Sequence, residues 1–158
     1  MSVPETLINE ALRKGIDLVD VLAKVLNLDP NERTEAHLEL AAEFLNEGKA
    51  LIDRDPIQAS ENLYKAAEEA IKALAIALNL DESRTALEQG RLITTLLFNA
   101  VDSISDKLGK EEVRLWWGRA WFLHVEGFHE ARLSPNQVKR DLKYVEAVVK
   151  LTQEYCGH

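Results

Sequence analysis

Apolar residues recur along the chain at intervals of three and four, the spacing that places side chains on one face of an α-helix. Six segments show this pattern, and no segment needs the alternation of apolar and polar residues that indicates a β-strand. The sequence therefore predicts an all-α fold, an antiparallel bundle of five to six helices.

Local signals predict where several of these helices begin. An aspartate or serine directly before a proline is typical of an N-cap residue and the first helical position. Such pairs occur at Asp29-Pro30, Asp55-Pro56 and Ser134-Pro135. Residues 79–90 are polar and weakly periodic, so we expect a connection there with at most a short helical turn. The pairs Glu61–Lys65 and Glu68–Lys72 are expected on a solvated outer helix face.

The first predicted helix follows Pro4 and has a wide apolar stripe. Residues such as Leu18 and Val21 widen this stripe beyond the width that one neighbouring helix covers. The helix is therefore either buried on two sides within the bundle or packed against a second copy of the chain. The second alternative predicts a homodimer through residues 1–28, with the bundle formed by residues 30–155 of the same domain.

The composition agrees with one globular, intracellular domain. A chain of 158 residues can bury a core without disulfides or metals, and 46% of its residues are hydrophobic. The lone Cys156 cannot form an internal disulfide and fits a reducing compartment. The N-terminal residues lack a basic stretch followed by an apolar one, and no run reaches the ~20 apolar residues of a membrane span. We therefore expect a cytoplasmic protein without a membrane partner.

The charge of the chain limits its binding partners. A formal net charge of −8 argues against broad binding to nucleic acid, which depends on exchanging counterions for Lys and Arg. Four cations nevertheless lie close together in the last third of the chain: Arg132, Lys139, Arg140 and Lys143. They either form an ordinary solvated face or a basic rim suited to the phosphate of a nucleotide or of RNA.

Residues 111–133 form the most distinctive predicted helix, which contains all three tryptophans and two histidines. Trp117 and His124 lie on one apolar stripe, so one interpretation makes His124 a hydrogen-bonded core histidine. In the other, the guanidinium of Arg119 binds a phosphate while the imidazole of His124 transfers a proton. Five α-helical steps separate these side chains by about 140°. Such a site therefore needs the reach of Arg119 or a second chain.

We expect no metal site and no cofactor. Glu126 and His129 are three residues apart, as are ligands in di-iron bundles, but a second such motif is missing. His124 and His129 are five apart, the wrong interval for two ligands on one face of an α-helix. The chain also has no glycine-rich phosphate loop, no nucleophile elbow and no CxxC pair.

Two segments resemble a known family. They are residues 59–74, ASENLYKAAEEAIKAL, and residues 117–130, where the resemblance is carried by Trp117, Ala120, Leu123, His124, Gly127, Phe128, His129 and Glu130. Both resemble the PaREP proteins of thermophilic archaea, which belong to the wider HEPN group of nucleotide-binding domains. The resemblance covers about residues 30 to 155, and it implies a HEPN-like bundle of four to five helices that dimerises.

The resemblance also implies two functions. Many HEPN proteins are metal-independent ribonucleases with an arginine and a histidine separated by four to six residues at a dimer cleft, and Arg119 and His124 have this spacing. Others lack activity and bind nucleotides or partner nucleotidyltransferases. Ala120 follows Arg119, where the ribonucleases usually have a polar residue, and this favours a non-catalytic module.

Three hypotheses follow. The first is a HEPN-like module that binds a nucleotide, nucleic acid or protein partner such as a nucleotidyltransferase, without catalysis. Its candidate ligand-binding residues are Trp117, His129, Glu130, Arg132, Lys139, Arg140 and Lys143. The second is a ribonuclease in which His124 acts as general base on a ribose 2′-hydroxyl and Arg119 steadies the phosphate. The third is a purely structural dimer.

Overall fold

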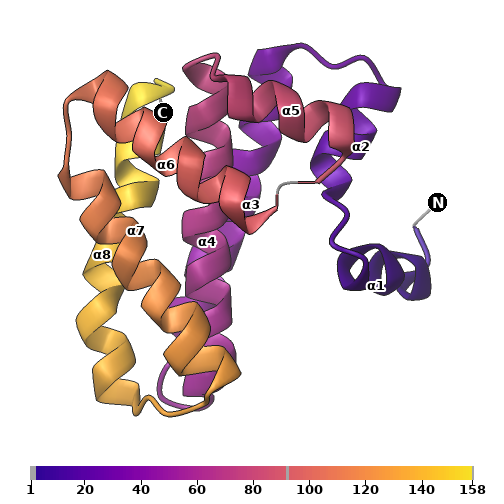
Figure 1. The fold of residues 1–158 in the computed structure, drawn as a ribbon. Coiled ribbons are helices and arrows are strands. Elements are labelled where there is room, and N and C mark those ends of the chain that lie inside the picture. The colour runs from indigo at the N-terminus through magenta and orange to yellow at the C-terminus, as the bar shows by residue number, and fades with distance from the viewer. Residues whose placement is uncertain (1–2, 92, 158) are drawn as a thin grey trace.

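The computed structural model describes residues 3–91 and 93–157, which form eight α-helices and one π-helical segment and contain no strand (Figure 1). In chain order these are α1 (Glu5–Arg13), α2 (Leu18–Val25), α3 (Pro30–Leu51), α4 (Pro56–Ala77), α5 (Asp81–Gln89), α6 (Thr94–Leu108), α7 (Glu112–Phe122), η1 (Leu123–His129) and α8 (Pro135–Tyr155). The all-α prediction is confirmed, and the expected number of helices was too low. None of the helices in the described part of the chain combines the length and the apolar character of a membrane span.

The number of helices exceeds the prediction because one predicted helix is broken in two and one predicted connection contains a helix. The expected N-terminal helix is broken at Gly15, whose φ of 72° is left-handed, and Asp17 then caps α2 by accepting a hydrogen bond from the backbone N–H of Asp20. The segment expected to be mainly a polar connection contains α5, which ends at the left-handed Gly90. The apolar stripe of the N-terminal region therefore does not run along one continuous helix.

The capping signals are confirmed at three helix starts. The side chains of Asp29, Asp55 and Ser134 each accept a hydrogen bond from the backbone N–H three residues later. In each case a proline occupies the first turn, where a missing N–H costs no helical hydrogen bond. These caps fix the starts of α3, α4 and α8, three of the four long helices of the bundle.

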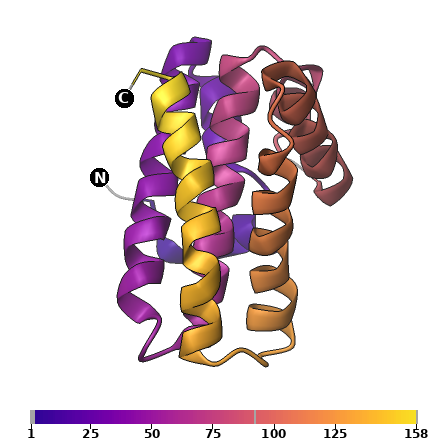
Figure 2. The same ribbon diagram turned by 90° about the vertical axis from the view of Figure 1, so that its left-hand side faces the viewer.

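The core lies around α4, which contacts α3, α6, α7, α8 and η1. Figure 2 shows α3, α4, α7 and α8 running roughly along one direction, with the α3–α4 and α7–α8 connections at the same end. Leu63, Ile71 and Leu74 of α4 are fully buried. Because α4 is packed on several sides, polar side chains on it also become buried, and two of the sites described below use them.

The N-terminal helices lie at the edge of this bundle. No residue of α1 is buried, and Figure 1 shows α1 standing away from the long helices. An open groove of about 560 Å³ is lined by residues of α1, α2, α3 and α4, with Leu12 of α1 and Phe44 of α3 among them. Leu7, Leu22 and Val25 are exposed as well. The N-terminal region therefore carries apolar surface that the chain itself leaves uncovered.

Candidate functional site

The candidate site lies where α7 continues directly into the π-helical segment η1. In a π-helix the hydrogen bonds join residues five apart, so side chains at this interval lie one turn apart on the same side. His124 and His129 are five apart, and their Nε2 atoms are separated by 3.1 Å. The assumption that an α-helix continues through residue 133 was therefore wrong, and so was the argument from it that these two imidazoles face apart.

A glycine allows η1 to approach α4 closely. Gly127 is buried, and a Cβ atom at this position would overlap the side chain of Ser60. The Ser60 hydroxyl is itself held in place, because it donates a hydrogen bond of 2.7 Å to the backbone carbonyl of Pro56. This contact brings the histidine-bearing segment against the first turns of α4.

Glu61 of α4 orients the imidazole of His124. Its carboxylate oxygens lie 3.0 and 3.2 Å from Nδ1 of His124, so Nδ1–H donates and Nε2 faces His129. The His124 ring also stacks on Tyr64, with ring centroids 4.2 Å apart. Glu61 is only 5% exposed, which means that it does not lie on the solvated outer face expected for it.

His124 combines features of both earlier interpretations. It is hydrogen-bonded and surrounded by aromatic rings, including those of Trp121 and Phe128, as a core histidine would be. However, its side chain is 19% exposed, and its Nε2 faces the exposed His129 rather than an apolar residue. The Nε2 atom of His124 therefore contacts an exposed imidazole and is not enclosed by apolar side chains.

Arg119 points toward α8 instead of toward His124. Its Nε and Nη2 donate to the two carboxylate oxygens of Asp141 at 2.8 and 3.0 Å, and its guanidinium lies 4.2 Å from the ring centroid of Phe122. The hydrogen bond to Asp141 raises the pKa of Arg119. No hydrogen bond or ion pair among the described residues joins Arg119 to His124. Within one chain, α8 therefore holds Arg119 through Asp141, whereas α4 holds His124 through Glu61.

Comparison with known proteins identifies the family. Residues 36–149 match the model of the archaeal PaREP1/PaREP8 family. The chain belongs to this family. A crystal structure of a protein from Sulfolobus solfataricus is 37% identical, with a TM-score of 0.60 over 77% of this PaREP chain and 94% of that chain. A solution structure of a structural-genomics target is 36% identical, with a TM-score of 0.59 over 79% and 92%. No curated protein matched.

Two cations of the expected basic rim are already paired in this PaREP protein. Arg132 lies 2.7 Å from a carboxylate oxygen of Glu126, and Lys139 lies 2.6 Å from one of Asp53. A phosphate that approached either cation would compete with these carboxylates. The rim therefore offers less positive charge than its sequence suggests.

The other proposed ligand-binding residues differ in accessibility. Arg140 and Glu130 are exposed, and the ammonium of Lys143 lies 5.2 Å from the ring centroid of Tyr144. Trp117 is only 2% exposed and belongs to the core, so its ring cannot contact a ligand at the surface. Its role at this site is to support Tyr64, whose ring centroid is 5.6 Å away.

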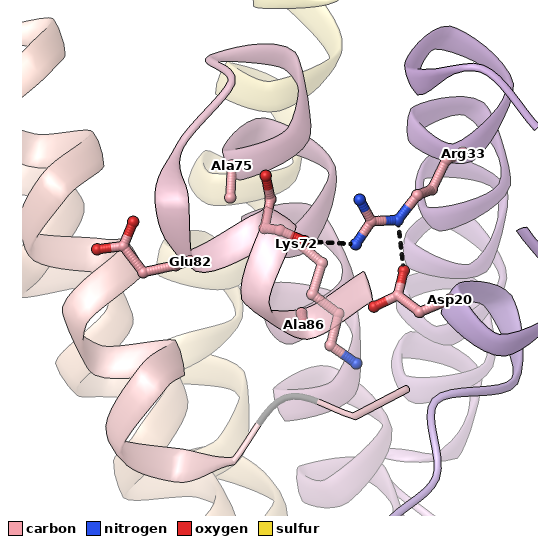
Figure 3. Close-up of a pocket in the computed structure, with 7 residues that line it drawn as sticks. Asp20, Arg33, Lys72, Ala75, Glu82 and Ala86 are labelled. Carbon is pink, nitrogen blue, oxygen red and sulfur yellow. Dashed lines mark hydrogen bonds and ion pairs between the residues drawn. The ribbon is translucent and has the colours of Figure 1, made fainter. Parts of the chain in front are cut away.

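A second polar cluster lies inside the protein and was missed by the sequence analysis. His37 of α3 is fully buried, with Nε2 3.1 Å from Asp20 and Nδ1 against Glu69. Burial lowers the pKa of His37, but the hydrogen bonds to these carboxylates outweigh burial and raise the pKa to about 9. His37 is therefore positively charged at neutral pH. Arg33 lies beside it and donates to Asp20 at 2.6 Å (Figure 3).

Lys72 extends this cluster along α4. Its ammonium lies 2.8 Å from Asp17 and 3.3 Å from Glu69, and its side chain is only 11% exposed. Lys72 was expected on a solvated face, and the difference arises because Asp17, the N-cap residue of α2, lies beside its ammonium. The only signal in the sequence was the spacing of Arg33 and His37, which are four residues apart and therefore lie on one face of the helix.

This cluster could in principle supply metal ligands. Oxygen or nitrogen atoms of Asp17, Asp20 and His37 lie within 4.8 Å of one another. However, Asp17 is paired with Lys72 and Asp20 with Arg33, and both ring nitrogens of His37 contact carboxylates. We interpret the cluster as an ion network that joins α2, α3 and α4.

Proposed function

We propose that this PaREP protein is a HEPN-like module that binds the phosphate of a nucleotide or of a short RNA segment. The phosphate binds at the surface of η1, next to His124 and His129. In this proposal the protein acts as a cytoplasmic homodimer and is not itself a catalyst. The observation that supports the proposal is the row of Glu61, His124 and His129, in which two imidazoles direct their Nε2 atoms to one place.

This row suits an anion for electrostatic reasons. The exposed His129 imidazole can donate a hydrogen bond from Nε2–H to a phosphate oxygen, while Glu61 accepts from Nδ1–H of His124 and holds that ring in place. The partly exposed ring of Phe128 borders His124, so a base could stack on it next to the bound phosphate. The net charge of −8 and the paired rim cations favour a short ligand over a long polyanion.

Titration with nucleotides tests this proposal. The ring centroids of Trp121 and His124 lie 5.1 Å apart. The fluorescence of Trp121 should therefore change when AMP, ADP or ATP binds. His129→Ala removes one charge-assisted hydrogen bond and should weaken binding about ten- to a hundredfold. Arg140→Ala is the control on the neighbouring rim. A loss of affinity for Arg140→Ala but not for His129→Ala would place the phosphate on the rim and contradict the proposal.

A ribonuclease is the second candidate, and the Glu61–His124 pair is the specific observation that favours it. A carboxylate that fixes the tautomer of a histidine is the arrangement by which many enzymes orient a general base. Because Asp141 holds Arg119, the phosphate would need an arginine from a second chain.

RNA cleavage distinguishes the two candidates. If His124 is a general base, His124→Ala should lower the rate of cleavage about 10² to 10⁴-fold, and Arg119→Lys should also lower it because lysine cannot form a bidentate fork. If the protein only binds, wild type and His124→Ala should show the same background rate. The assay contains a chelator, so that contaminating metal ions do not cleave the RNA.

A partner protein is a further part of the proposal. The uncovered apolar residues of α1 and α2 support an interface with a second copy, and a nucleotidyltransferase is the alternative occupant of the same surface. Chromatographic mass measurement of the isolated chain tests the first alternative, as argued in the Discussion.

A further inference from the structure

We infer that His124 and His129 together bind a divalent transition-metal ion such as Zn²⁺. Their Nε2 atoms lie 3.1 Å apart, whereas their ring centroids lie 4.4 Å apart, so both rings turn the Nε2 edge toward one position. Zn–N bonds of about 2.0–2.1 Å at angles between 90° and 109° place two ligand nitrogens roughly 2.8–3.4 Å apart. The observed separation lies within this range without any movement of the backbone.

The π-helical backbone creates this pair. In an α-helix, histidines at this interval would point about 140° apart. In η1 the wider turn brings residues five apart onto one face, and Gly127 between them lies against Ser60 of α4. The two ligands are thus fixed by the packing of η1 and not by flexible loops.

Glu61 provides the second observation that points to a metal. Histidine ligands commonly donate the N–H of their other ring nitrogen to a carboxylate, which fixes the tautomer and makes the ligating nitrogen more basic. Glu61 accepts from Nδ1–H of His124 in this way and is itself buried, so the lone pair of Nε2 is directed toward His129. Stacking of Tyr64 holds the ring from the side.

The surroundings define the type of site and the class of ion. The His129 side chain is exposed, so water or a phosphate oxygen can complete the coordination, as in metal sites that keep open positions. Two imidazoles favour Zn²⁺, Cu²⁺, Ni²⁺ or Co²⁺ over Mg²⁺ and Ca²⁺, which prefer oxygen ligands. With Nδ1–H of His124 donated to Glu61, the hydrogen bond between the two Nε2 atoms is donated by His129. When the metal binds, His129 takes the Nδ1–H tautomer, and both Nε2 lone pairs are directed to the metal.

Competition between the protein and a chromophoric chelator for Zn²⁺ tests the inference. All variants carry Cys156→Ser, which removes the only thiol, and the Cys156→Ser protein should bind one equivalent of Zn²⁺. His129→Asn should lower the affinity at least tenfold, since one of two protein ligands is lost. Glu61→Gln should lower it about ten- to a hundredfold. Lys150→Ala, an exposed change near the C-terminal end of α8, should leave the affinity unchanged.

Cobalt provides an independent readout. Co²⁺ bound by the Cys156→Ser protein should give visible d–d absorption that His129→Asn removes. Circular dichroism establishes that each variant is folded, and His129→Asn decides the question if the buried Glu61→Gln variant fails to fold. Failure to bind one equivalent of Zn²⁺, or equal affinity for His129→Asn and its parent, would overturn the inference.

The experiments can contradict the metal site and the proposed nucleotide binding independently of each other. Nucleotide titrations are carried out with excess chelator, and Zn²⁺ titrations without nucleotide. Zn²⁺ binding that depends on His129 supports the metal site even where no nucleotide binds. Nucleotide binding without any such Zn²⁺ binding contradicts the metal site alone.

Discussion

At the scale of single residues, the buried charge of His37 should govern how stability depends on pH. Hydrogen bonds to Asp20 and Glu69 raise the pKa of His37 to about 9, well above its ordinary value of 6.5 in an unfolded chain. Because the folded state holds the proton more tightly, this contribution is fully present below pH 6.5 and is lost as pH rises through about 9.

This predicts a loss of about 3 kcal/mol in the free energy of unfolding between pH 6.5 and 10. Urea unfolding at a series of pH values measures it. The control is His37→Gln, which should be less stable at pH 7 but should lack most of the decline, because glutamine does not titrate. An equal decline in both proteins would show that other groups cause it.

From residue types and their spacing we could identify some candidate site residues, but not the residues that they contact. Two histidines on an aromatic helix stand out in any sequence, so His124 and His129 were found. Glu61 was missed because a glutamate four residues before a lysine is typical of a solvated helix face, and only the approach of η1 buries it. Contacts between residues 63 positions apart leave no local signal.

At the scale of secondary-structure elements, the close contact between η1 and α4 depends on a missing side chain. We predict that Gly127→Ala destabilises the protein by about 1–3 kcal/mol, because the added methyl group overlaps Ser60. The matched control is Gly118→Ala in α7, where the methyl group meets nothing within 4 Å. Alanine should stabilise that helix by about 0.5–1 kcal/mol.

Urea unfolding of the two glycine variants gives opposite signs if this explanation is correct. Gly127→Ala should also weaken Zn²⁺ and nucleotide binding, since both depend on the register of η1. If Gly127→Ala were as stable as the wild type, the tight contact with α4 would not be what fixes the π-helical segment.

The starts of α3, α4 and α8 were predictable because their causes are local, whereas the π-helix was not predictable. The caps at Asp29, Asp55 and Ser134 use side chains within three residues of the N–H groups they satisfy. The π-helical segment lies where Gly127 meets a distant helix, and that contact leaves no local signal in the sequence. The break at Gly15 falls between these cases, because a glycine alone does not specify a left-handed φ.

At the scale of the whole molecule, the proposed homodimer rests on the distribution of exposed apolar residues. Leu7, Leu12, Leu22, Val25 and Leu26 are exposed and all lie within the first 26 residues, whereas Leu115 is isolated on α7. The groove between these N-terminal helices and α3–α4 gives the same region a concave surface. A surface with both protruding and hollow apolar parts can pair with itself about a two-fold axis, which is the commonest symmetry of homodimers.

We therefore predict a homodimer that Leu22→Glu dissociates and Leu115→Glu leaves intact. Both leucines are at least half exposed, so either glutamate is tolerated in the folded chain, but at Leu22 it would be buried without a partner in the dimer. Size-exclusion chromatography with light scattering measures the mass of each protein. A monomeric wild type would contradict the dimer. Dissociation by Leu115→Glu with an intact Leu22→Glu dimer would instead place the interface on α7. In that arrangement the second chain could bring its Arg119 toward His124, and the ribonuclease candidate would gain the arginine that it lacks within one chain.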